Sequence, residues 1–472
     1  MDTNIFREYD IRGIVGEQLT DETVNQIARA IATFFAQRDA KRIAVGYDAR
    51  MSSPGFCSIL TDALVSAGCD AVQIGMVPTP VLYHTVHTKD VDGGVMVTGS
   101  HNPPNHNGFK IALGTKTLFG DQIQEIKRIA LDEMQRPARE QGRDQDSTSQ
   151  AETRPSGSVS ELVVLDAYIT DITAKLSFGP RKLKAVVDGG NGMGGVTAVP
   201  AYEKLGVELI KLFTEPDSNF PNHHPDPTVE ANLQDVIAAV RENNADVGLA
   251  FDGDGDRIGV VDETGRIIWG DELMILLSRE ILAVNPGATI IAEVKCSQNL
   301  FEDIERNGGT AIMERAGHSI IKSRMQATGA LLAGEMSGHI FFADRFYGFD
   351  DATYAGARLL EILSKTDKPL SQMFEGIPRT FSTPELRIDC PDEIKFDVVA
   401  KIAEHFVQTH KVITIDGARI VFENGWGLVR ASNTQAILVL RFEADSPDQL
   451  TAIRTEVESV VNAAVQQLET RN

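Results

Sequence analysis

The chain has 472 residues, of which 42% are hydrophobic and 24% are charged. A chain of this length exceeds what one hydrophobic core supports, so we expect about three to four domains of ordinary globular composition. The formal net charge of −22 argues against nucleic acid and against an anionic membrane as partners, because both bind basic surfaces.

Strands and helices alternate in the first third of the chain, which predicts a first α/β domain over residues 1–150. The expected strands are 42–47, 71–74 and 94–97, and the expected helices are 56–67, one after Pro80, and 121–135. Residues 136–160 are rich in Arg, Gln, Asp, Ser and Thr and nearly lack large apolar residues. We interpret them as an exposed, mobile linker.

The apolar run 94–97 ends in the polar turn Thr98-Gly99-Ser100-His101-Asn102-Pro103. This places Ser100 at the carboxyl end of a strand, where open α/β sheets bind their ligands. A serine hydroxyl is an effective nucleophile only when it is activated or already carries the group to be transferred. The alternative is a loop that only turns the chain.

A second α/β domain is predicted over residues 151–258, with strands at 184–188, 208–212 and 247–251 and helices at 198–205 and 233–243. Its last strand leads into Asp252-Gly253-Asp254-Gly255-Asp256-Arg257. Carboxylates at alternate positions suit a hard divalent cation, and the glycines let the chain fold tightly around it. An aspartyl nucleophile at Asp252 is a rival hypothesis, since phosphatases of the haloacid dehalogenase type also begin with an Asp after an apolar strand.

A third α/β domain is predicted over residues 259–371, with helices at 271–283 and 299–306 and strands at 289–292 and 330–333. The strand 330–333 is followed by Gly334-Glu335-Met336-Ser337-Gly338-His339. Glu335 and Ser337 are two residues apart, so both can point the same way and hydrogen-bond to vicinal hydroxyls. The alternative is that Glu335 is a surface charge.

Residues 372–472 differ from the rest and predict a small α+β domain. We expect strands at 386–390 and 436–442, a helix at 398–410, a hairpin around Asp416-Gly417 and a final helix to about residue 468. A loop containing Arg430, Ser432, Asn433 and Thr434 precedes the strand at 436. Guanidinium, hydroxyl and amide groups together are well suited to bind a phosphate.

The four loops taken together, in this order, resemble those of the α-D-phosphohexomutase family, and within it the bacterial phosphomannomutase/phosphoglucomutase branch. The resemblance runs nearly end to end, excepting residues 136–160. It implies three related α/β/α domains with mixed sheets and a C-terminal α+β domain of TATA-binding-protein-like type, arranged around a central cleft. It also implies an isomerase that moves a phosphoryl group between the 1- and 6-positions of a mannose or glucose phosphate, through phosphoserine and a hexose 1,6-bisphosphate.

The resemblance also implies roles for individual residues. Ser100 would be the phosphoserine, and Mg²⁺ would be held by Ser100, Asp252, Asp254 and Asp256. The residues around the transfer would be Arg12, Ser100, His101, Lys110, Arg257 and His339, with His339 a candidate general base. The substrate-binding residues would be Tyr9, Lys295, His318, Glu335, Ser337, Arg430, Ser432, Asn433 and Thr434. The chain departs from the family after Thr434, where Gln435-Ala436 replaces the expected Glu-Pro or Thr-Pro.

Other functions stay open at the level of the sequence. A metal-dependent sugar-phosphate phosphatase would use the same serine or aspartates, and a phosphoglucosamine mutase would belong to the same family. A non-catalytic sugar-phosphate sensor would not need a nucleophile beside a metal loop. Four scattered cysteines, and an N-terminus with neither a basic nor an apolar segment, favour a cytoplasmic protein, and we expect a monomer or dimer.

Overall fold

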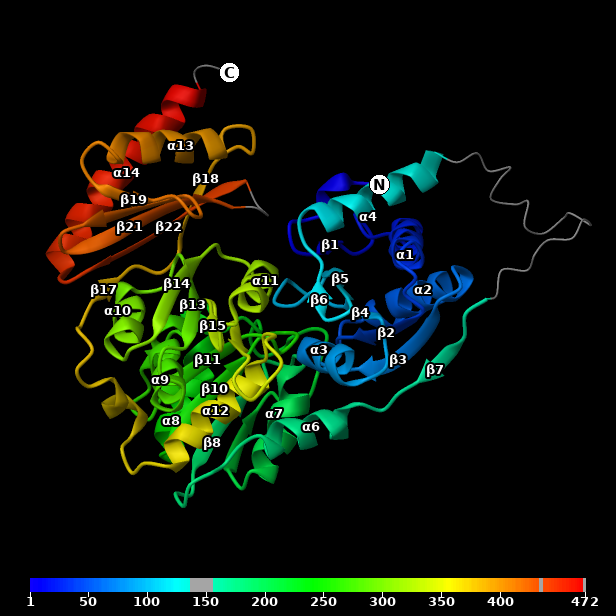
Figure 1. Cartoon of the computed structure of the whole chain (residues 1–472), viewed down its shortest axis with the longest axis horizontal. Helices are drawn as coiled ribbons and strands as arrows, with labels where there is room; N and C mark the ends of the chain where they lie inside the picture. Colours follow the sequence, from blue (N-terminus) through cyan, green and yellow to red (C-terminus); the bar gives the residue numbers. More distant parts are fainter. Residues whose placement is uncertain (136–155, 433–435, 470–472) are drawn as a thin grey trace, which may run out of the picture.

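The computed structural model describes residues 1–135, 156–432 and 436–469, and four sheets organise them (Figure 1). The first sheet is seven-stranded, with the order β1-β5-β4-β2-β3-β7 and β6 paired to β5. Its strands are β1 (Ile11–Ile14), β2 (Arg42–Tyr47), β3 (Asp70–Met76), β4 (Gly93–Val97), β5 (His106–Leu113), β6 (Lys116–Thr117) and β7 (Val159–Glu161). The helical segments of this unit are η1 (Thr3–Ile5), α1 (Asp21–Ala36), α2 (Ser53–Ser66), α3 (Thr79–Thr88) and α4 (Asp121–Gln135).

The second sheet is five-stranded, with the order β12-β11-β10-β8-β9. Its strands are β8 (Lys184–Asp188), β9 (Glu208–Leu212), β10 (Val247–Phe251), β11 (Ile258–Asp262) and β12 (Ile267–Ile268). Its helical segments are α6 (Leu165–Ala174), α7 (Gly194–Lys204), η2 (Glu230–Leu233) and α8 (Gln234–Asn243).

The third sheet is four-stranded, with the order β14-β13-β15-β16. Its strands are β13 (Thr289–Glu293), β14 (Thr310–Glu314), β15 (Leu332–Gly334) and β16 (Ile340–Phe342). Its helical segments are α9 (Gly270–Val284), α10 (Gln298–Arg306), α11 (His318–Thr328), α12 (Ala352–Ser364) and η3 (Leu370–Phe374).

The fourth sheet is six-stranded and antiparallel, with the order β17-β22-β21-β20-β19 and β18 paired to β22. Its strands are β17 (Phe381–Ser382), β18 (Leu386–Asp389), β19 (Lys411–Ile413), β20 (Ala418–Phe422), β21 (Gly425–Ala431) and β22 (Ile437–Ala444). Helices α13 (Lys395–Phe406) and α14 (Pro447–Glu469) pack on it. We call the four units the first to fourth domains.

The first three domains repeat one plan. In each, a strand lies between a parallel neighbour and an antiparallel one: β4 pairs parallel with β2 and antiparallel with β5. Strand β10 has the same position between β8 and β11, and β15 has it between β13 and β16. The predicted fold class is therefore confirmed, with three related mixed sheets and a separate α+β domain.

Amphipathic helices bury the sheets. Helix α1 begins after Thr20, whose side chain accepts a hydrogen bond from the backbone nitrogen of Thr23. The apolar face of α1 packs with α2 and α4 on one side of the first sheet. Helix α3 covers the other side, and its Val81 and Leu82 belong to a core that continues through the second and third domains. The fourth domain has its own core.

The linker prediction falls mostly on residues 136–155, which lie outside the described residues. It is wrong at its C-terminal end, because Val159–Glu161 form β7, parallel to β3 in the first sheet. Ser158 fixes the register by donating from its backbone nitrogen and its hydroxyl to Asp70 Oδ1, each at 2.7 Å. Because β7 is exposed on both faces, it carries no apolar pattern that would reveal a strand. The domain boundaries stay predictions, and β7 belongs to the first sheet although it follows residue 150.

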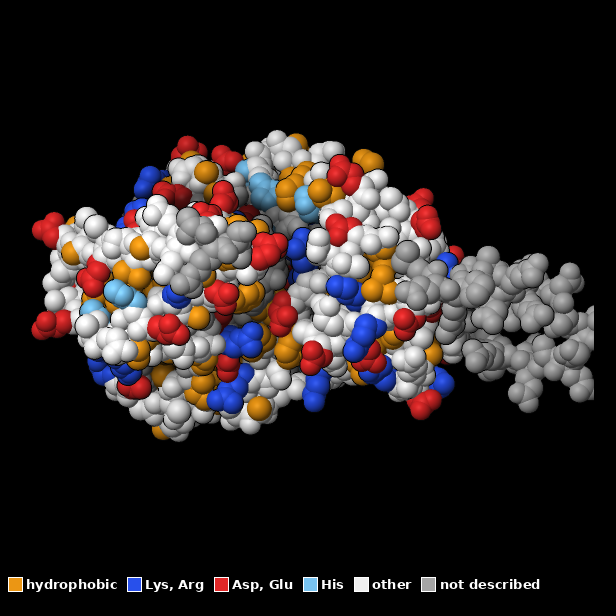
Figure 2. Space-filling model, turned by 90° about the horizontal axis from the view of Figure 1, so that it is seen from above, with side chains coloured by type: hydrophobic (Ala, Val, Ile, Leu, Met, Phe, Trp, Pro, Cys, Tyr) orange, Lys and Arg blue, Asp and Glu red, His pale blue; other side chains and the backbone are white. Residues whose placement is uncertain are grey.

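Among the described helices, none is long and apolar enough to cross a membrane. Seen from above in Figure 2, the surface is hollowed where the fourth domain faces the first, and Lys and Arg side chains lie at this hollow.

Candidate functional site

Ser100 lies in the connection between β4 and β5, in a backbone conformation that is unusual for serine. Its φ is +49°, in the left-handed region, and its side chain is buried. The Ser100 hydroxyl donates to Asp252 Oδ2 at 3.1 Å, and His101 Nδ1 lies 3.2 Å from Ser100 Oγ. This contact joins two residues that are 152 positions apart in the chain.

Arg50 holds the Ser100 loop in place, a role that no local sequence pattern predicts. Its guanidinium is buried and donates to the carbonyl oxygens of Ser100 at 2.7 Å, Asn102 at 2.6 Å and Pro103 at 2.6 Å. A Cβ on Gly99 would lie 2.5 Å from this guanidinium, so the loop needs glycine there. Only the folded chain brings Arg50 and the loop together.

The three aspartates of the second domain form a buried cluster at the end of β10. Asp252, Asp254 and Asp256 are fully buried, and each offers a carboxylate oxygen within 4.8 Å of the others'. Lys110 donates to Asp254 Oδ2 at 2.7 Å and to Asp256 Oδ2 at 2.6 Å. Lys110 lies within strand β5, which is not among the strands expected from the sequence.

The pKa values of these groups follow from burial and mutual charge. Burial raises the pKa of Asp252 well above its usual value, and the neighbouring Asp256 and Asp254 raise it further. Burial would also raise the pKa of Asp254, but the Lys110 ammonium outweighs it and holds that pKa well below the usual range. Burial opposes the charge of Lys110, yet Asp254 and Asp256 keep its pKa well above normal.

The aspartate cluster fits a metal ion. The Oδ1 atoms of Asp254 and Asp256 are buried and have no hydrogen-bond partner among the described residues. Such atoms are costly to bury unless something binds them. An all-oxygen donor set suits a hard divalent cation such as Mg²⁺.

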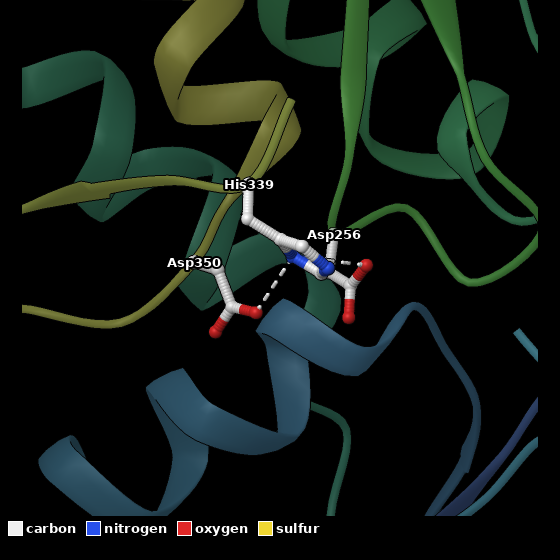
Figure 3. A group of neighbouring side chains, drawn as sticks. All are labelled: Asp256, His339 and Asp350. Atoms are coloured by element: carbon white, nitrogen blue, oxygen red, sulfur yellow. Dashed lines mark ion pairs between the residues drawn. The ribbon is translucent and has the colours of Figure 1, made fainter. Parts of the chain in front are cut away.

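His339 connects the metal loop to the third domain (Figure 3). Its Nε2 accepts a hydrogen bond from Arg257 Nε at 2.8 Å. Its Nδ1 lies 3.0 Å from Asp350 Oδ2 and 3.5 Å from Asp256 Oδ1. Asp350 is fully buried, and its other oxygen accepts from Lys322 Nζ at 2.9 Å. No local sequence pattern marks Asp350, which lies near the end of the connection from β16 to α12, or Lys322, which lies within α11.

His318 and Glu335 lie on the third-domain side of the site. The His318 ring stacks on that of His339 with centroids 5.6 Å apart, and burial lowers the pKa of His318 well below its usual value. Glu335 is buried in the connection between β15 and β16, where its Oε2 accepts from the Ser337 hydroxyl at 3.1 Å. The two side chains therefore meet, and their binding to sugar hydroxyls stays a prediction.

Lys295 lies between two carboxylates that belong to different domains. Its Nζ is 3.1 Å from Glu385 Oε2 and 3.6 Å from Glu293 Oε1. Burial would lower the pKa of Lys295, but these two carboxylates raise it. The Lys295 charge in turn lowers the pKa of Glu385 to about 2.

Arg430 lies within strand β21, so placing it in a loop was wrong: the connection to β22 begins only after Ala431. Its Nε donates to Asp416 Oδ2 at 3.1 Å. Ser432 is buried at the start of the connection. Asn433 and Thr434, the other predicted phosphate-binding residues, lie outside the described residues, as does Gln435.

Arg12 and Tyr9 bring the N-terminal segment to the site. Arg12 donates to Asn102 Oδ1 at 3.2 Å, in the Ser100 loop, and pairs with Asp10. Tyr9 donates to the carbonyl oxygen of Ala316 at 2.8 Å, and its ring contacts His318 edge-on. Contacts from each of the four domains therefore link the predicted residues that the structure describes.

Comparisons with known proteins show the family to which these four domains belong. Four family models match: phosphoglucomutase/phosphomannomutase α/β/α domains I (residues 3–137), II (166–265) and III (269–381), and the C-terminal domain (385–460). The chain is 47% identical over 453 residues to the phosphomannomutase/phosphoglucomutase of Pseudomonas putida, which covers 96% of this chain and 94% of that protein. It is 45% identical over 463 residues to the phosphoglucomutase of Neisseria gonorrhoeae, covering 98% and 97%.

A solved structure shows the same fold. The crystal structure of a phosphoglucomutase/phosphomannomutase family protein from Burkholderia thailandensis superimposes with a TM-score of 0.89 at 42% identity, and the match covers 98% of each chain. All four domains are matched, in order, both by the family models and by full-length relatives. The chain therefore belongs to the phosphoglucomutase/phosphomannomutase family of α-D-phosphohexomutases.

Proposed function

We propose that the chain is an isomerase that moves a phosphoryl group reversibly between the 1- and 6-positions of a hexose phosphate. Mannose and glucose phosphates are the proposed substrates, in line with the names of relatives that are 45–47% identical. The observation that carries the proposal is the 3.1 Å contact between the Ser100 hydroxyl and the aspartate cluster. A non-catalytic sensor would not need a nucleophile in contact with an aspartate cluster.

In the proposed reaction Ser100 carries the phosphoryl group at the start. The hydroxyl of the bound sugar phosphate attacks this phosphorus, so the bond from phosphorus to the sugar oxygen forms and the bond to Ser100 Oγ breaks. The sugar hydroxyl gives up its proton, and a hexose 1,6-bisphosphate results. The bisphosphate turns over, and the reverse of this step at its other phosphate restores phosphoserine and releases the isomer.

The chain's own charges suit a phosphoryl transfer, which depends on positioning and on neutralising charge. Three cations would neutralise the phosphoryl oxygens: Arg12, which contacts the Ser100 loop, Lys110, which contacts the aspartate cluster, and Arg257, which contacts His339. His339 is the candidate base, but its Nε2 is engaged by Arg257 in this structure. Proton transfer to this nitrogen therefore requires the Arg257 contact to open when substrate binds.

Asp252, Asp254, Asp256 and the Ser100 oxygen would hold Mg²⁺, which when bound would withdraw charge from the phosphoryl group. Glu335 and Ser337 would hydrogen-bond to sugar hydroxyls, and Arg430 with Ser432, Asn433 and Thr434 would bind the phosphate that is not being transferred. Tyr9, His101, Lys295 and His318 would complete the binding surface. The oligomeric state, monomer or dimer, stays a prediction.

The variant Ser100→Ala tests the proposal. We expect it to lose nearly all conversion of mannose 6-phosphate to mannose 1-phosphate, while calorimetry still detects substrate binding. Labelled hexose 1,6-bisphosphate should phosphorylate the wild-type protein but not this variant. Ser66→Ala, at an exposed position at the end of α2, is the matched control and should behave as wild type. Normal isomerisation by Ser100→Ala, or release of free phosphate at each turnover, would refute the mutase mechanism.

A further inference from the structure

Two consecutive residues, Ala316 and Gly317, form backbone hydrogen bonds with side chains of three domains. The carbonyl oxygen of Ala316 accepts from the Tyr9 hydroxyl of the first domain at 2.8 Å. The Ala316 nitrogen donates to Asp416 Oδ2 of the fourth domain at 3.0 Å. The next nitrogen, that of Gly317, donates to Glu335 Oε1 of the third domain at 2.8 Å. We call these two residues the 316–317 junction.

Asp416 contacts more than the junction. The Oδ2 atom that accepts from Ala316 also accepts from Arg430 Nε at 3.1 Å. Asp416 lies in the turn between β19 and β20, and its side chain is only 10% exposed. A single carboxylate oxygen therefore joins the fourth-domain arginine to the third-domain junction that also binds Glu335.

The junction is built for this close approach. Gly317 has a φ of +135°, which side-chain-bearing residues rarely adopt. A Cβ at this position would lie 2.5 Å from Cζ of the Tyr9 ring. Tyr9 can therefore reach Ala316 only because residue 317 is glycine.

Asp416 is one of the residues that attach the fourth domain to the third. The apolar cluster that spans the third and fourth domains contains the buried residues Val294, Trp426 and Leu428, and it is small. Hydrogen bonds also join these two domains. For example, Arg419 of the fourth domain donates to the carbonyl oxygens of Val294 and Cys296 in the third. Among the described residues, Asp416 is thus one of several polar side chains that join the fourth domain to the third, together with Arg419 and Arg441.

We propose that Asp416 is a positioning residue that holds Arg430 and the 316–317 junction in one arrangement. The group that would bind the substrate phosphate and the group that would bind the sugar hydroxyls are then kept at a fixed distance from each other. This inference rests on the proposed function, in which Arg430 binds a phosphate and Glu335 binds sugar hydroxyls. With Nε held by Asp416, the terminal nitrogens of Arg430 are left to grip a phosphate with two parallel hydrogen bonds. Without Asp416, the Arg430 side chain is flexible in the free protein. Phosphate binding must then order this side chain, and the entropy cost lowers the affinity for the phosphate.

The test compares substrate binding in variants that cannot turn over. Calorimetry with glucose 1-phosphate is done on Ser100→Ala and on the same protein carrying Asp416→Ala or Asp416→Asn. We expect Asp416→Ala to raise Kd by about tenfold or more, the usual effect of losing a hydrogen bond to a charged group. Asp416→Asn keeps an oxygen for Ala316 but loses the charge that orients Arg430, so its Kd should lie in between. With Ser100 intact, KM should rise more than kcat falls.

A double-mutant cycle separates positioning from a general structural effect. If Asp416 acts through Arg430, Asp416→Ala should weaken binding far less in an Arg430→Ala background than in its absence. Asp389→Ala removes an exposed carboxylate from β18 of the same domain and should leave Kd unchanged. If Asp416→Ala does not fold, the cycle is run with Asp416→Asn, which is nearly isosteric.

The inference is wrong if Asp416→Ala binds with the wild-type Kd, or if the two substitutions are additive. Either result leaves the proposed function standing, provided that the protein with Asp416 intact binds and isomerises sugar phosphates. If the wild-type protein neither binds nor isomerises them, the proposed function itself fails.

Discussion

Asp252, Asp254 and Asp256 bring three carboxylates into a buried space where Lys110 is the cation that contacts two of them. Like charges this close in a low-dielectric environment repel strongly. The raised pKa of Asp252, caused by burial and by its two neighbours, expresses this excess of negative charge. A bound dication would relieve it, and this is the physical basis of the proposed metal site.

The variant Asp254→Asn should therefore bind metal less well. We expect at least a tenfold loss of Mg²⁺ or Mn²⁺ affinity, by calorimetry, because removal of a charged ligand costs at least as much as the roughly 10–100-fold effect of losing a second-shell group. Treatment with EDTA should inactivate the wild-type protein, and added Mg²⁺ should restore it. Asp62→Asn, on the exposed face of α2, serves as the control. Unchanged metal affinity in Asp254→Asn would place the metal elsewhere.

Asp350 is a buried carboxylate that lies beside the rings of His339 and His318. Burial would raise its pKa, but Lys322 and then the nearby His339 and His318 hold it well below the usual value. We predict that Asp350→Asn lowers kcat by about 10–100-fold with little change in KM, because the orientation of His339 matters in the transition state more than in binding. Steady-state kinetics with glucose 1-phosphate measure both constants.

A double variant provides the control for this prediction. Asp350→Asn leaves the Lys322 ammonium buried without its anion, and an unpaired buried charge is strongly destabilising. Asp350→Asn combined with Lys322→Met removes both charges, so thermal stability should recover while kcat stays low. Recovery of kcat along with stability would show that Asp350 serves the fold alone.

At the scale of elements, the functional loops occupy equivalent places. The Ser100 loop joins β4 to β5, the aspartate loop joins β10 to β11, and the Glu335 loop joins β15 to β16. Each connects a strand of the parallel part of a mixed sheet to the antiparallel strand beside it. The loops also touch one another, since residues 257 and 339 form an isolated β-bridge between the second and third domains.

The contact between the first two loops predicts that Gly253→Ala is harmful. A Cβ on Gly253 would lie 2.2 Å from the carbonyl oxygen of Ser100. Because this oxygen belongs to the backbone, the clash can be relieved only by a shift of the main chain. We expect a loss of about 1–3 kcal/mol of stability, typical of overpacking, and a larger loss of activity because Ser100 is displaced. Gly55→Ala, in α2 with nothing near its Cβ, should be neutral or slightly stabilising in the same thermal and kinetic assays.

The sequence reveals these loops because each follows a buried apolar strand, a local pattern that survives without tertiary information. It does not reveal β5, since Lys110 interrupts its apolar run, or assign Arg430 to β21 rather than to the loop that follows. The roles of Arg50, Asp350 and Asp416 lie beyond any local pattern. Each acts only on groups that the fold brings to it, such as the carbonyl oxygens held by Arg50.

Taken as a whole molecule, the protein has one apolar core that runs through its first three domains, a further cluster in each of these domains, and a separate core in the fourth. The second and third domains are also joined by Tyr168 of α6, whose hydroxyl lies 2.9 and 2.8 Å from the two oxygens of Asp351. Asp351 is the N-cap of α12 and accepts from the backbone nitrogen of Tyr354 at 2.8 Å. This carboxyl group is therefore a structural link between two domains.

Asp351 should make the stability of the protein depend on pH. Burial raises its pKa from 3.8 to about 7, with Asp350 adding to the shift against the opposing hydrogen bonds from Tyr354 and Tyr168. Between about pH 4 and pH 7 the folded protein keeps a proton that the unfolded chain has lost, so this group favours the folded state less as pH rises through that window.

The variant Asp351→Asn removes this titration while keeping an oxygen that can accept from Tyr168 and from Tyr354. Relative to the variant, the wild-type protein should become progressively less stable from pH 4 to pH 7 and then stay constant, as measured by urea midpoints at unit pH intervals. Asp367→Asn, at an exposed position after α12, should show no such trend. A difference between wild type and Asp351→Asn that does not vary with pH would mean that Asp351 ionises normally in the folded protein. Tyr168 would then be bound to an ordinary carboxylate, and the link between the second and third domains would not respond to pH through this group.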